Sequence, residues 1–164
     1  RKPLVKISRL VIGDELVLRD IRLRALADSP SAYGSSLELE VALTDADWRN
    51  RLARIDAATF IARDGDGTAI GLVTGMIDDD FANVGWLLSM WVEPTKRGNG
   101  VAGQLIDEVL AWSREQNCTS LLLQVTEGNT SALRTYEKRG FRQTGTTVLR
   151  ERDNMAETGM ELIL

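Results

Sequence analysis

The stretch between Leu88 and Ile106 constrains the fold of this chain more than any other part of its sequence. An apolar run ends at Val92, and Pro94 follows; because proline has no backbone N–H, it ends the strand that the run predicts. A glycine-rich bend then leads into a segment whose apolar residues recur at helical spacing. They are Val101, Leu105, Val109 and Trp112, with Ala102, Ile106 and Leu110 beside them. The sequence therefore predicts a buried strand, a bend and an amphipathic helix, in that order.

The bend is a candidate phosphate-binding site. The first amide N–H groups of a helix have no partner within the helix, and Lys96 and Arg97 stand just before this one. Such a helix terminus favours a bound phosphate or pyrophosphate. The same residues also fit a tight turn with two solvated cations, and the glycines alone do not separate the two interpretations.

Two families use glycines at this spacing. Gly98-x-Gly100-x-x-Gly103 matches the dinucleotide-binding fingerprint, which normally follows its strand at once, whereas here the segment 94–97 intervenes. The same residues also form the pattern Arg97-x-x-Gly100-x-Ala102 after Val92-x-Pro94. In that form they resemble the acetyl-CoA signature of the GCN5-related N-acetyltransferase (GNAT) family.

A second segment, from Asn129 to Phe141, resembles the other signature of the GNAT family. Its pattern is an asparagine, an alanine three residues on, a tyrosine seven residues on and a closing Gly-Phe. Asn129, Ala132 and Tyr136 share one helix face because spacings of three and four align. Alone, the segment also fits a capping asparagine and a half-buried core aromatic. Paired with the bend, it favours the GNAT family, and the resemblance covers roughly residues 58–148.

Composition excludes several other functions. Without histidine, no Ser-His-Asp or Cys-His nucleophile can form, and with Cys118 as the single cysteine we expect no Cys/His metal site and no internal disulfide. One thiol suits a reducing, cytoplasmic location. The net charge of −4 argues against a nucleic-acid partner, and neither a signal region nor a membrane-spanning run is present, so no membrane is expected. The length predicts one domain over residues 1–164.

The first half of the chain predicts antiparallel strands and surface helices. We expect an edge strand over 4–11 and a helix over 15–27, with Leu16, Leu23 and Leu26 facing inward and Arg19, Arg22 and Arg24 in solvent. A loop with a short helix over 33–40 and a helix over 45–54 capped by Thr44 follow. The turn at 64–67 predicts a hairpin between strands at 58–63 and 69–77, in which Gly71 and Gly75 mark bends or close packing.

The second half predicts the centre of the sheet. The strand over 84–92 is apolar on both faces, with Trp86, Leu88 and Met90 on one and Leu87 and Trp91 on the other, so we expect it to be covered on both sides. With the helix after the bend and a strand over 121–125 it makes a parallel pair. A helix over 130–139, closed by Gly140, and an antiparallel pair of strands over 141–148 and 155–164 complete the chain.

The resemblance implies a fold of the α/β (α+β) class: a mixed, mostly antiparallel sheet, with a central pair of parallel strands that splay apart, flanked by helices. The cosubstrate acetyl-CoA would lie in the cleft between the splayed strands, and no metal is implied. The residues that the resemblance assigns to its binding are Met90, Trp91, Val92, Arg97, Gly98, Asn99, Gly100, Val101, Ala102, Gly103, Asn129 and Tyr136.

The implied reaction is transfer of the acetyl group to a primary amine of a small molecule or peptide, by direct attack in a ternary complex. The attack creates an oxyanion that a fixed N–H near Met90 would stabilise. The leaving thiolate, with a pKa near ~8.5, gains from a proton donor such as Tyr136. An amine with a pKa near ~10.4 must first lose a proton. Several relatives carry a glutamate where this chain has Gln124, so Glu127 and Glu93 are substitute candidates for the base, beside a route through water alone.

Two alternatives from other classes stay open at this point. A non-catalytic acyl-CoA-binding or sensor domain would keep the bend and need neither Tyr136 nor a base. A nicotinamide-binding oxidoreductase would need a second wound half, for which only about sixty residues remain after Gly103. A homodimer also stays open. By the resemblance, the acceptor amine enters from the side built by the early helices and the loop before the central strand. We expect an acidic rim there that attracts a cationic amine. Its residues are Glu38, Glu40, Asp45, Asp47 and Asp78–Asp80.

Overall fold

The computed structural model describes residues 4–164, so Arg1–Pro3, part of the segment inspected for a signal region, lie outside the described residues. The strands are β1 (Lys6–Arg9), β2 (Ala57–Arg63), β3 (Ala69–Ile77), β4 (Val84–Val92), β5 (Ser120–Thr126), β6 (Arg142–Leu149) and β7 (Ala156–Ile163). The α-helices are α1 (Glu15–Asp28), α2 (Leu37–Val41), α3 (Asp45–Ala53), α4 (Val101–Glu115) and α5 (Thr130–Glu137). Two 3-10 helices, η1 (Pro30–Ala32) and η2 (Pro94–Lys96), precede the loop before α2 and the glycine bend.

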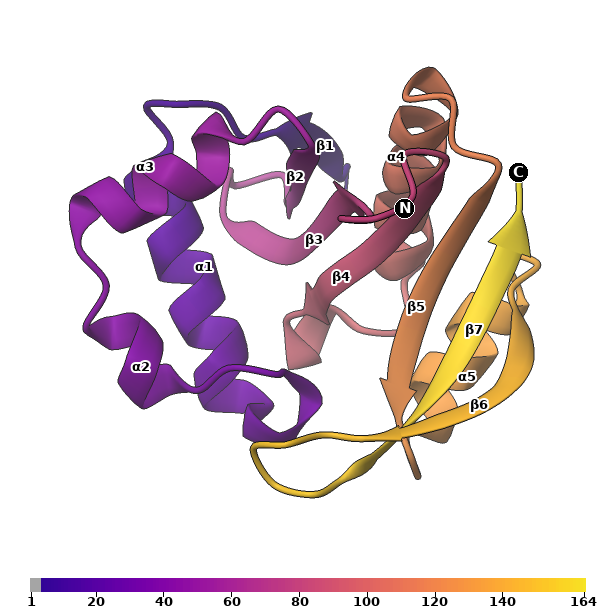
Figure 1. The fold of residues 1–164 in the computed structure, drawn as a ribbon. Helices are drawn as coiled ribbons and strands as arrows, with labels where there is room; N and C mark the ends of the chain where they lie inside the picture. The colour runs from indigo at the N-terminus through magenta and orange to yellow at the C-terminus, as the bar shows by residue number, and fades with distance from the viewer. Residues whose placement is uncertain (1–3) are drawn as a thin grey trace.

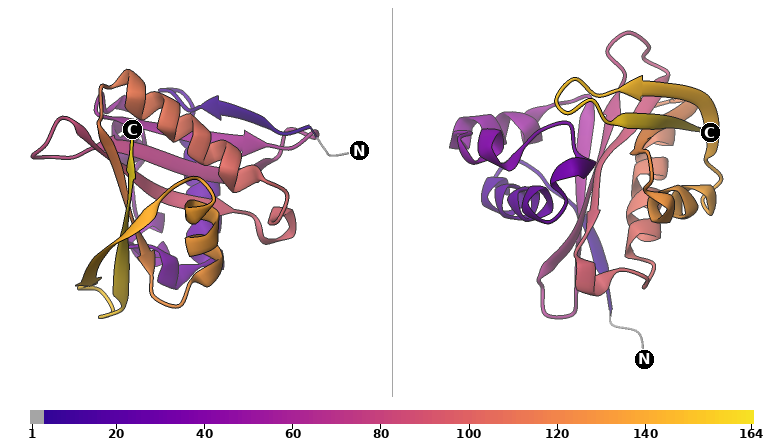
Figure 2. Two further views of the ribbon diagram at one scale, coloured as in Figure 1. Left: turned by 90° about the vertical axis from the view of Figure 1, so that its right-hand side faces the viewer. Right: turned by 90° about the horizontal axis from the view of Figure 1, so that it is seen from below.

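The strands form one seven-stranded sheet in the order β1-β2-β3-β4-β5-β7-β6. All neighbours run antiparallel except β4 and β5, which are parallel. Helices α1, α2 and α3 lie on one face of the sheet, and α4 and α5 lie on the other (Figures 1 and 2). The predicted mixed sheet with a central parallel pair is therefore confirmed. The sequence did not predict that β7 lies between β5 and β6.

The packing of α4 on the sheet explains two glycines of β3. A Cβ atom on Gly75 would lie 2.8 Å from Cε3 of Trp112, and one on Gly71 would lie 2.9 Å from Cδ1 of Leu105. Both distances are shorter than van der Waals contact, so only glycine lets the helix approach this closely. The prediction of close packing at these positions is confirmed.

Helix α1 corrects two predictions. Leu16 was expected to face inward, but its side chain is 76% exposed, whereas Leu18, Ile21, Ala25 and Leu26 are buried. The inward face therefore begins at Val17 and Leu18, while Leu23 and Leu26 pack inward as expected. Arg22 falls on that face and is only 9% exposed, so it is not the solvated cation that the sequence suggested.

Strand β4 corrects a third prediction. Its ladder with β3 shifts register between Leu72 and Thr74, and Ser89 has a φ of 60°, so β4 carries a bulge. A bulge adds one residue and reverses the alternation of side chains beyond it. As a result Leu87 packs in the core beside α4, whereas Trp91 packs in the core beside α1, and the two do not share a face.

Helix α3 begins as predicted, with the Thr44 side chain accepting from the N–H of Asp47 and Asp47 accepting from the N–H of Thr44. Across residues 4–164, every helix is too short or too polar to cross a membrane.

Candidate active site

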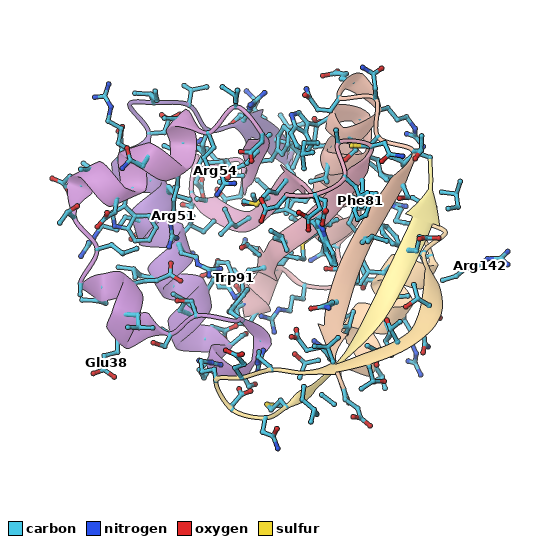
Figure 3. All side chains as sticks on the ribbon, in the orientation of Figure 1. Glu38, Arg51, Arg54, Phe81, Trp91 and Arg142 are labelled. Atoms are coloured by element: carbon cyan, nitrogen blue, oxygen red, sulfur yellow. The ribbon has the colours of Figure 1, made fainter. Side chains whose placement is uncertain are left out.

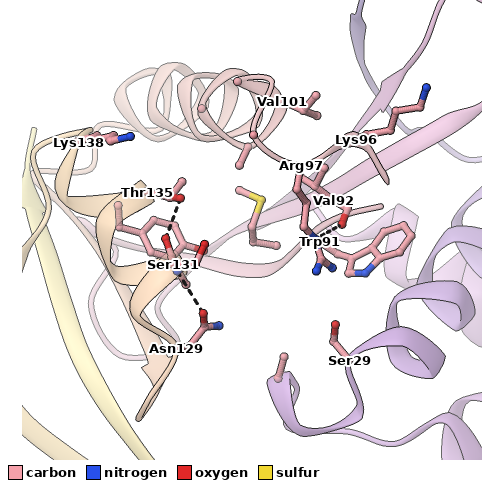
Figure 4. A pocket seen from close by; sticks show the side chains of 18 of the residues that line it. Ser29, Trp91, Val92, Lys96, Arg97, Val101, Asn129, Ser131, Thr135 and Lys138 are labelled. Atoms are coloured by element: carbon pink, nitrogen blue, oxygen red, sulfur yellow. Dashed lines mark hydrogen bonds between the residues drawn. The ribbon is translucent and has the colours of Figure 1, made fainter. Parts of the chain in front are cut away.

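The sheet opens between β4 and β5. The two strands pair only where Val84–Trp86 face Ser120–Leu122, although β4 continues to Val92 and β5 to Thr126. A cleft of about 450 Å³ lies where they part, between the end of β4, the glycine bend and α5 (Figure 4).

The end of β4 turns backbone groups toward this cleft. The carbonyl of Met90 accepts a hydrogen bond from the hydroxyl of Tyr33 at 3.1 Å, and the carbonyl of Val92 accepts one from Nε of Arg97 at 2.8 Å. In an antiparallel strand the N–H and C=O of one residue leave on the same edge. The N–H groups of Met90 and Val92 therefore face the splayed edge, where an extended ligand with amide groups can pair with them.

The glycine bend forms one end of the cleft. Gly98 and Gly100 each have a φ of +82°, and a Cβ atom on either would meet nothing within 4 Å, so the backbone is open on that side. Gly100 is the N-cap of α4, and no side chain caps this terminus. The first N–H groups of the helix, from Val101 to Gly103, thus have no intrahelical partner and line the cleft. This arrangement suits a phosphate group.

Arg97 is fixed beside the bend by α1. Its Nη2 donates to Oδ2 of Asp28 at 2.8 Å, and Nε1 of Trp91 donates to the same oxygen at 3.0 Å. The hydrogen bonds from Trp91, Ser29 and Arg97 together hold the pKa of Asp28 below its usual value. Asp28 therefore stays ionised and keeps Arg97 at the cleft at neutral pH.

Further cations come from the segment just after α5 and from η2. Lys138 and Lys96 lie on opposite sides of the cleft (Figure 4). Arg139, just past the end of α5, reaches α4, where its guanidinium covers Gly103 and its Nε lies 3.2 Å from Oδ1 of Asp107. The cleft thus has positive charge around the open helix terminus, as a polyphosphate ligand requires.

Helix α5 supplies the opposite wall. Asn129 accepts a hydrogen bond from the N–H of Ala132 at 3.2 Å and so caps the helix, while it also lines the cleft. Tyr136 is 7% exposed and packs edge to face against Phe141, with ring centroids 5.7 Å apart. Burial raises the pKa of Tyr136, so its hydroxyl keeps its proton at neutral pH.

A second cavity, of about 420 Å³, lies on the α1 side of the splayed strands. It shares its walls with the cleft at Ala32, Tyr33, Met90, Asn129, Ala132 and Tyr136. Its other walls include Trp86, Gln124 and Glu157. The two cavities share walls at Met90 and Tyr136, so they offer adjoining space for two ligands.

The cleft brings together most residues predicted to bind the coenzyme. They are Met90, Trp91, Val92, Arg97, Gly98, Gly100, Val101, Ala102, Gly103, Asn129 and Tyr136. Asn99 is not among the lining residues; it is exposed, and its Nδ2 lies 3.5 Å from the carbonyl oxygen of Lys96.

Neither carboxylate predicted as a base lines either cavity. Glu93 lies past the end of β4, with Oε1 at 3.4 Å from Nη2 of Arg24. Glu127 is exposed just after β5, and its backbone N–H bonds to the carbonyl of Ala156. Gln124 does line the second cavity, as the resemblance suggests for that position.

The expected acidic rim is smaller in the structure. Glu40 is 1% exposed and bound to Arg22 and Arg51, so it is not a rim charge. Asp78 accepts from Nε1 of Trp86 at 2.8 Å. Asp47 is engaged in the cap of α3.

Three residues that line the cavities were not predicted from the sequence: Tyr33, Arg139 and Glu157. Tyr33 lies in a stretch without periodicity, and Arg139 and Glu157 reach the site only because of how α5 and β7 pack. For Tyr33, a large aromatic followed by Gly34-Ser35 was the one available signal.

Comparison with known proteins agrees with this geometry. The family model described as Acetyltransferase (GNAT) family matches residues 23–141. Aminoglycoside N(6')-acetyltransferase type 1 of Salmonella typhimurium is 32% identical over 105 residues, which cover 60% of this chain and 72% of that protein.

Solved structures share the fold. An acetyltransferase of the GNAT family from Streptococcus pneumoniae has a TM-score of 0.80 at 18% identity, covering 98% of this chain and 100% of the other. Spermidine N-acetyltransferase from Vibrio cholerae, in complex with CoA and spermine, has a TM-score of 0.76 at 18% identity, covering 97% and 95% of the two chains.

Fold and cleft thus define an α/β transferase built around a splayed parallel strand pair. More narrowly, the chain belongs to the GNAT family of acetyltransferases. At the level of that family it is an acyl-CoA-dependent N-acetyltransferase.

Proposed function

We propose that this protein transfers the acetyl group of acetyl-CoA to a primary amine of a small molecule or peptide, by direct attack in a ternary complex. The observation that supports this most strongly is the junction of the two cavities at Met90 and Tyr136. One cavity leads to the cationic glycine bend and the other leads to the α1 face of the sheet, so the two substrates can approach from opposite sides.

The chain's residues fit acetyl-CoA. The open backbone at Gly98 and Gly100, the free N–H groups at the start of α4 and the nearby Arg97 would hold the pyrophosphate. The edge of β4 would pair with the pantetheine arm, and Asn129 would line its path. The coenzyme supplies an acetyl thioester, which is activated toward attack by an amine.

Two residues would then assist the transfer. The N–H of Met90 would donate to the thioester oxygen as negative charge develops there. Tyr136, which keeps its proton because burial raises its pKa, would protonate the departing sulfur. Glu93 and Glu127 do not line the cavities, so the proton of the amine leaves through another group or through water.

The acceptor is proposed only as a class. Relatives named as aminoglycoside and spermidine acetyltransferases act on amines that carry several positive charges. A cationic amine is consistent with the net charge of −4 of this chain.

A calorimetric titration with acetyl-CoA and with NAD tests the binding site. We expect acetyl-CoA to bind and NAD not to bind, and Gly100→Glu to abolish acetyl-CoA binding, because its carboxylate would occupy the pyrophosphate position. Gly145→Glu is the matched control, since Gly145 also has a φ of +82°, has nothing within 4 Å of its Cβ position and lies outside both cavities.

Turnover separates the enzyme from a non-catalytic sensor. Release of free CoA thiol in the presence of a panel of amines is expected only for an enzyme. If acetyl-CoA binds but no amine increases thiol release, the sensor alternative is correct. If Gly100→Glu binds acetyl-CoA with the affinity of the wild type, the bend does not hold the pyrophosphate and that assignment is wrong.

A further inference from the structure

We infer that Glu157 binds the ammonium group of the acceptor and takes up its proton. This inference rests on the proposed function, because it concerns the second substrate of the same site. The base then lies on β7, a strand whose place beside the site was not predicted from the sequence.

The register of the sheet places Glu157 beside Gln124. Thr126 of β5 faces Glu157 of β7, and Gln124 faces Gly159. Cross-strand partners project from the same face of a sheet, and so do residues two apart on one strand. Glu157 therefore shares a face with Gln124 and lies one strand over. The Gln124 amide on β5 cannot take up a proton, whereas Glu157 on the neighbouring strand carries a carboxylate that can.

Glu157 opens into the second cavity. It is half-buried and lines the same space as Tyr136 and Met90, which the proposed function places at the reacting centre. Among residues 4–164 it is the one acidic residue in the lining of either cavity. A carboxylate there can reach an amine that approaches Tyr136, directly or through one water molecule.

The nearby cations have other partners. Arg22, which also lines the cavity, gives two hydrogen bonds of 3.0 Å to Glu40. Arg150, whose pKa the Glu157 charge helps to raise after the larger effect of Asp153, donates to that aspartate at 2.9 Å and 2.6 Å. Within the described part of the chain, no ion pair engages Glu157 itself. The cavity therefore offers a negative charge that a cationic ligand can meet.

The step balances without a further reactant. A proton passes from the ammonium to Glu157, the nitrogen lone pair forms a bond to the acetyl carbon, and the bond from that carbon to sulfur breaks. Tyr136 gives its proton to the sulfur and recovers one from the nitrogen as the neutral amide forms. Glu157 then releases its proton to water, so the products are the acetylated amine, CoA and one proton.

The test uses Glu157→Gln, which keeps the shape of the side chain and removes its charge. Glu161→Gln is the matched control, because Glu161 lies on the same strand and projects from the same face, yet lines neither cavity. The protein–CoA complex is titrated calorimetrically with spermine, an aminoglycoside and a diamino acid, and acetyl-CoA affinity is measured separately.

We expect at least one of the three probes to bind the wild type, about 10- to 100-fold weaker binding to Glu157→Gln, and unchanged binding to Glu161→Gln. For any amine that is turned over, Glu157→Gln should also lower kcat about 10²-fold or more, with acetyl-CoA affinity unchanged. A purely structural role would not separate amine binding from coenzyme binding in this way.

Equal probe affinity and equal kcat in Glu157→Gln and the wild type would overturn the inference, as would failure of all three probes to bind the wild type. Neither result touches the proposed coenzyme site. If the wild type did not bind acetyl-CoA, the proposed function itself would be contradicted, so the two failures are distinguishable.

Discussion

Replacing Glu40 by alanine should destabilise the protein strongly, although Glu40 lies on a five-residue surface helix. Its carboxylate accepts two hydrogen bonds of 3.0 Å from Arg22 and one of 2.8 Å from Arg51. Burial alone would raise the pKa of Glu40, but hydrogen bonds and charge from Arg22 and Arg51 outweigh it and the pKa is lowered. The group is therefore a carboxylate anion at neutral pH.

The size of the loss in stability depends on the partners that Arg22 keeps after the substitution. The Arg22 side chain is 10% exposed, and without Glu40 its charge keeps only the hydroxyl of Ser89 at 3.2 Å and the face of the Tyr33 ring. Removing one partner of a buried ion pair in this way typically lowers the free energy of unfolding by about 3–5 kcal/mol. The pair with Arg51, whose side chain is 42% exposed, adds less than about 1 kcal/mol.

Urea unfolding of the wild type, Glu40→Ala and Glu38→Ala measures the effect. Glu38 lies on the same helix and points away from the molecule, so its substitution should change the free energy of unfolding by at most about 0.5 kcal/mol (Figure 3). If Glu40→Ala lowers the free energy of unfolding by less than about 1 kcal/mol, the buried pair of Arg22 and Glu40 does not hold α1 and α2 together, and the reasoning is refuted.

Three further perturbations test other parts of the structure. Tyr136→Phe should lower kcat about 10²-fold, because it deletes one proton donor, and should leave acetyl-CoA affinity unchanged in a calorimetric titration. Gly75→Ala should lower the free energy of unfolding by about 1–3 kcal/mol, since its Cβ would lie 2.8 Å from Trp112. Hydrogen bonds from Arg150 lower the pKa of Asp153 to about 2 in the folded protein. The contribution of Asp153 to the free energy of unfolding is therefore complete above the pKa of an unfolded aspartate, near ~3.9, and is lost as the pH falls toward 2. Asp153→Asn should therefore be less stable than the wild type at pH 7, with the difference shrinking between pH 4 and pH 2.

Each of these has a clear contrary result. Tyr136→Phe with wild-type kcat, when chemistry limits the rate, would make Tyr136 a packing residue. Gly34→Ala is the control for Gly75→Ala, because nothing lies within 4 Å of its Cβ position and its φ is not positive, and equal stability of the two variants would argue against close packing. A difference between Asp153→Asn and the wild type that stays constant down to pH 2 would contradict the assigned pKa.

Local pattern predicted most of the helices and strands, and it singled out most of the residues that come together at the cleft. The bend at Gly98–Gly103 and the segment from Asn129 to Phe141 each lie within one strand–turn–helix unit, so their residues are close both in sequence and in space; their assignment to coenzyme binding came from the resemblance to the GNAT family. The long helix after the bend and the hairpin at 64–67 were predicted for the same reason.

The second cavity could not be predicted, because its walls come from distant segments of the chain. Glu157 and Gln124 line the same cavity only because β7 is inserted between β5 and β6, and no feature of sequence spacing indicates that insertion. Likewise, Arg22 reads as a surface cation until Glu40 from another helix is packed on it. The bulge at Ser89 adds one residue to β4 and so changes which face of the sheet the later side chains point to. A continuous apolar run gives no sign of where such an extra residue occurs.

The most direct test of the central claim, direct transfer in a ternary complex, combines initial rates with the mass of the intact protein. Both cavities lack a cysteine in their lining, and Cys118, the single thiol of the chain, lies buried elsewhere. Rates measured over a grid of acetyl-CoA and amine concentrations should give intersecting double-reciprocal lines, and protein incubated with acetyl-CoA alone should keep its mass. Parallel lines together with a protein that has gained an acetyl group would contradict direct attack and would require an acetylated enzyme intermediate.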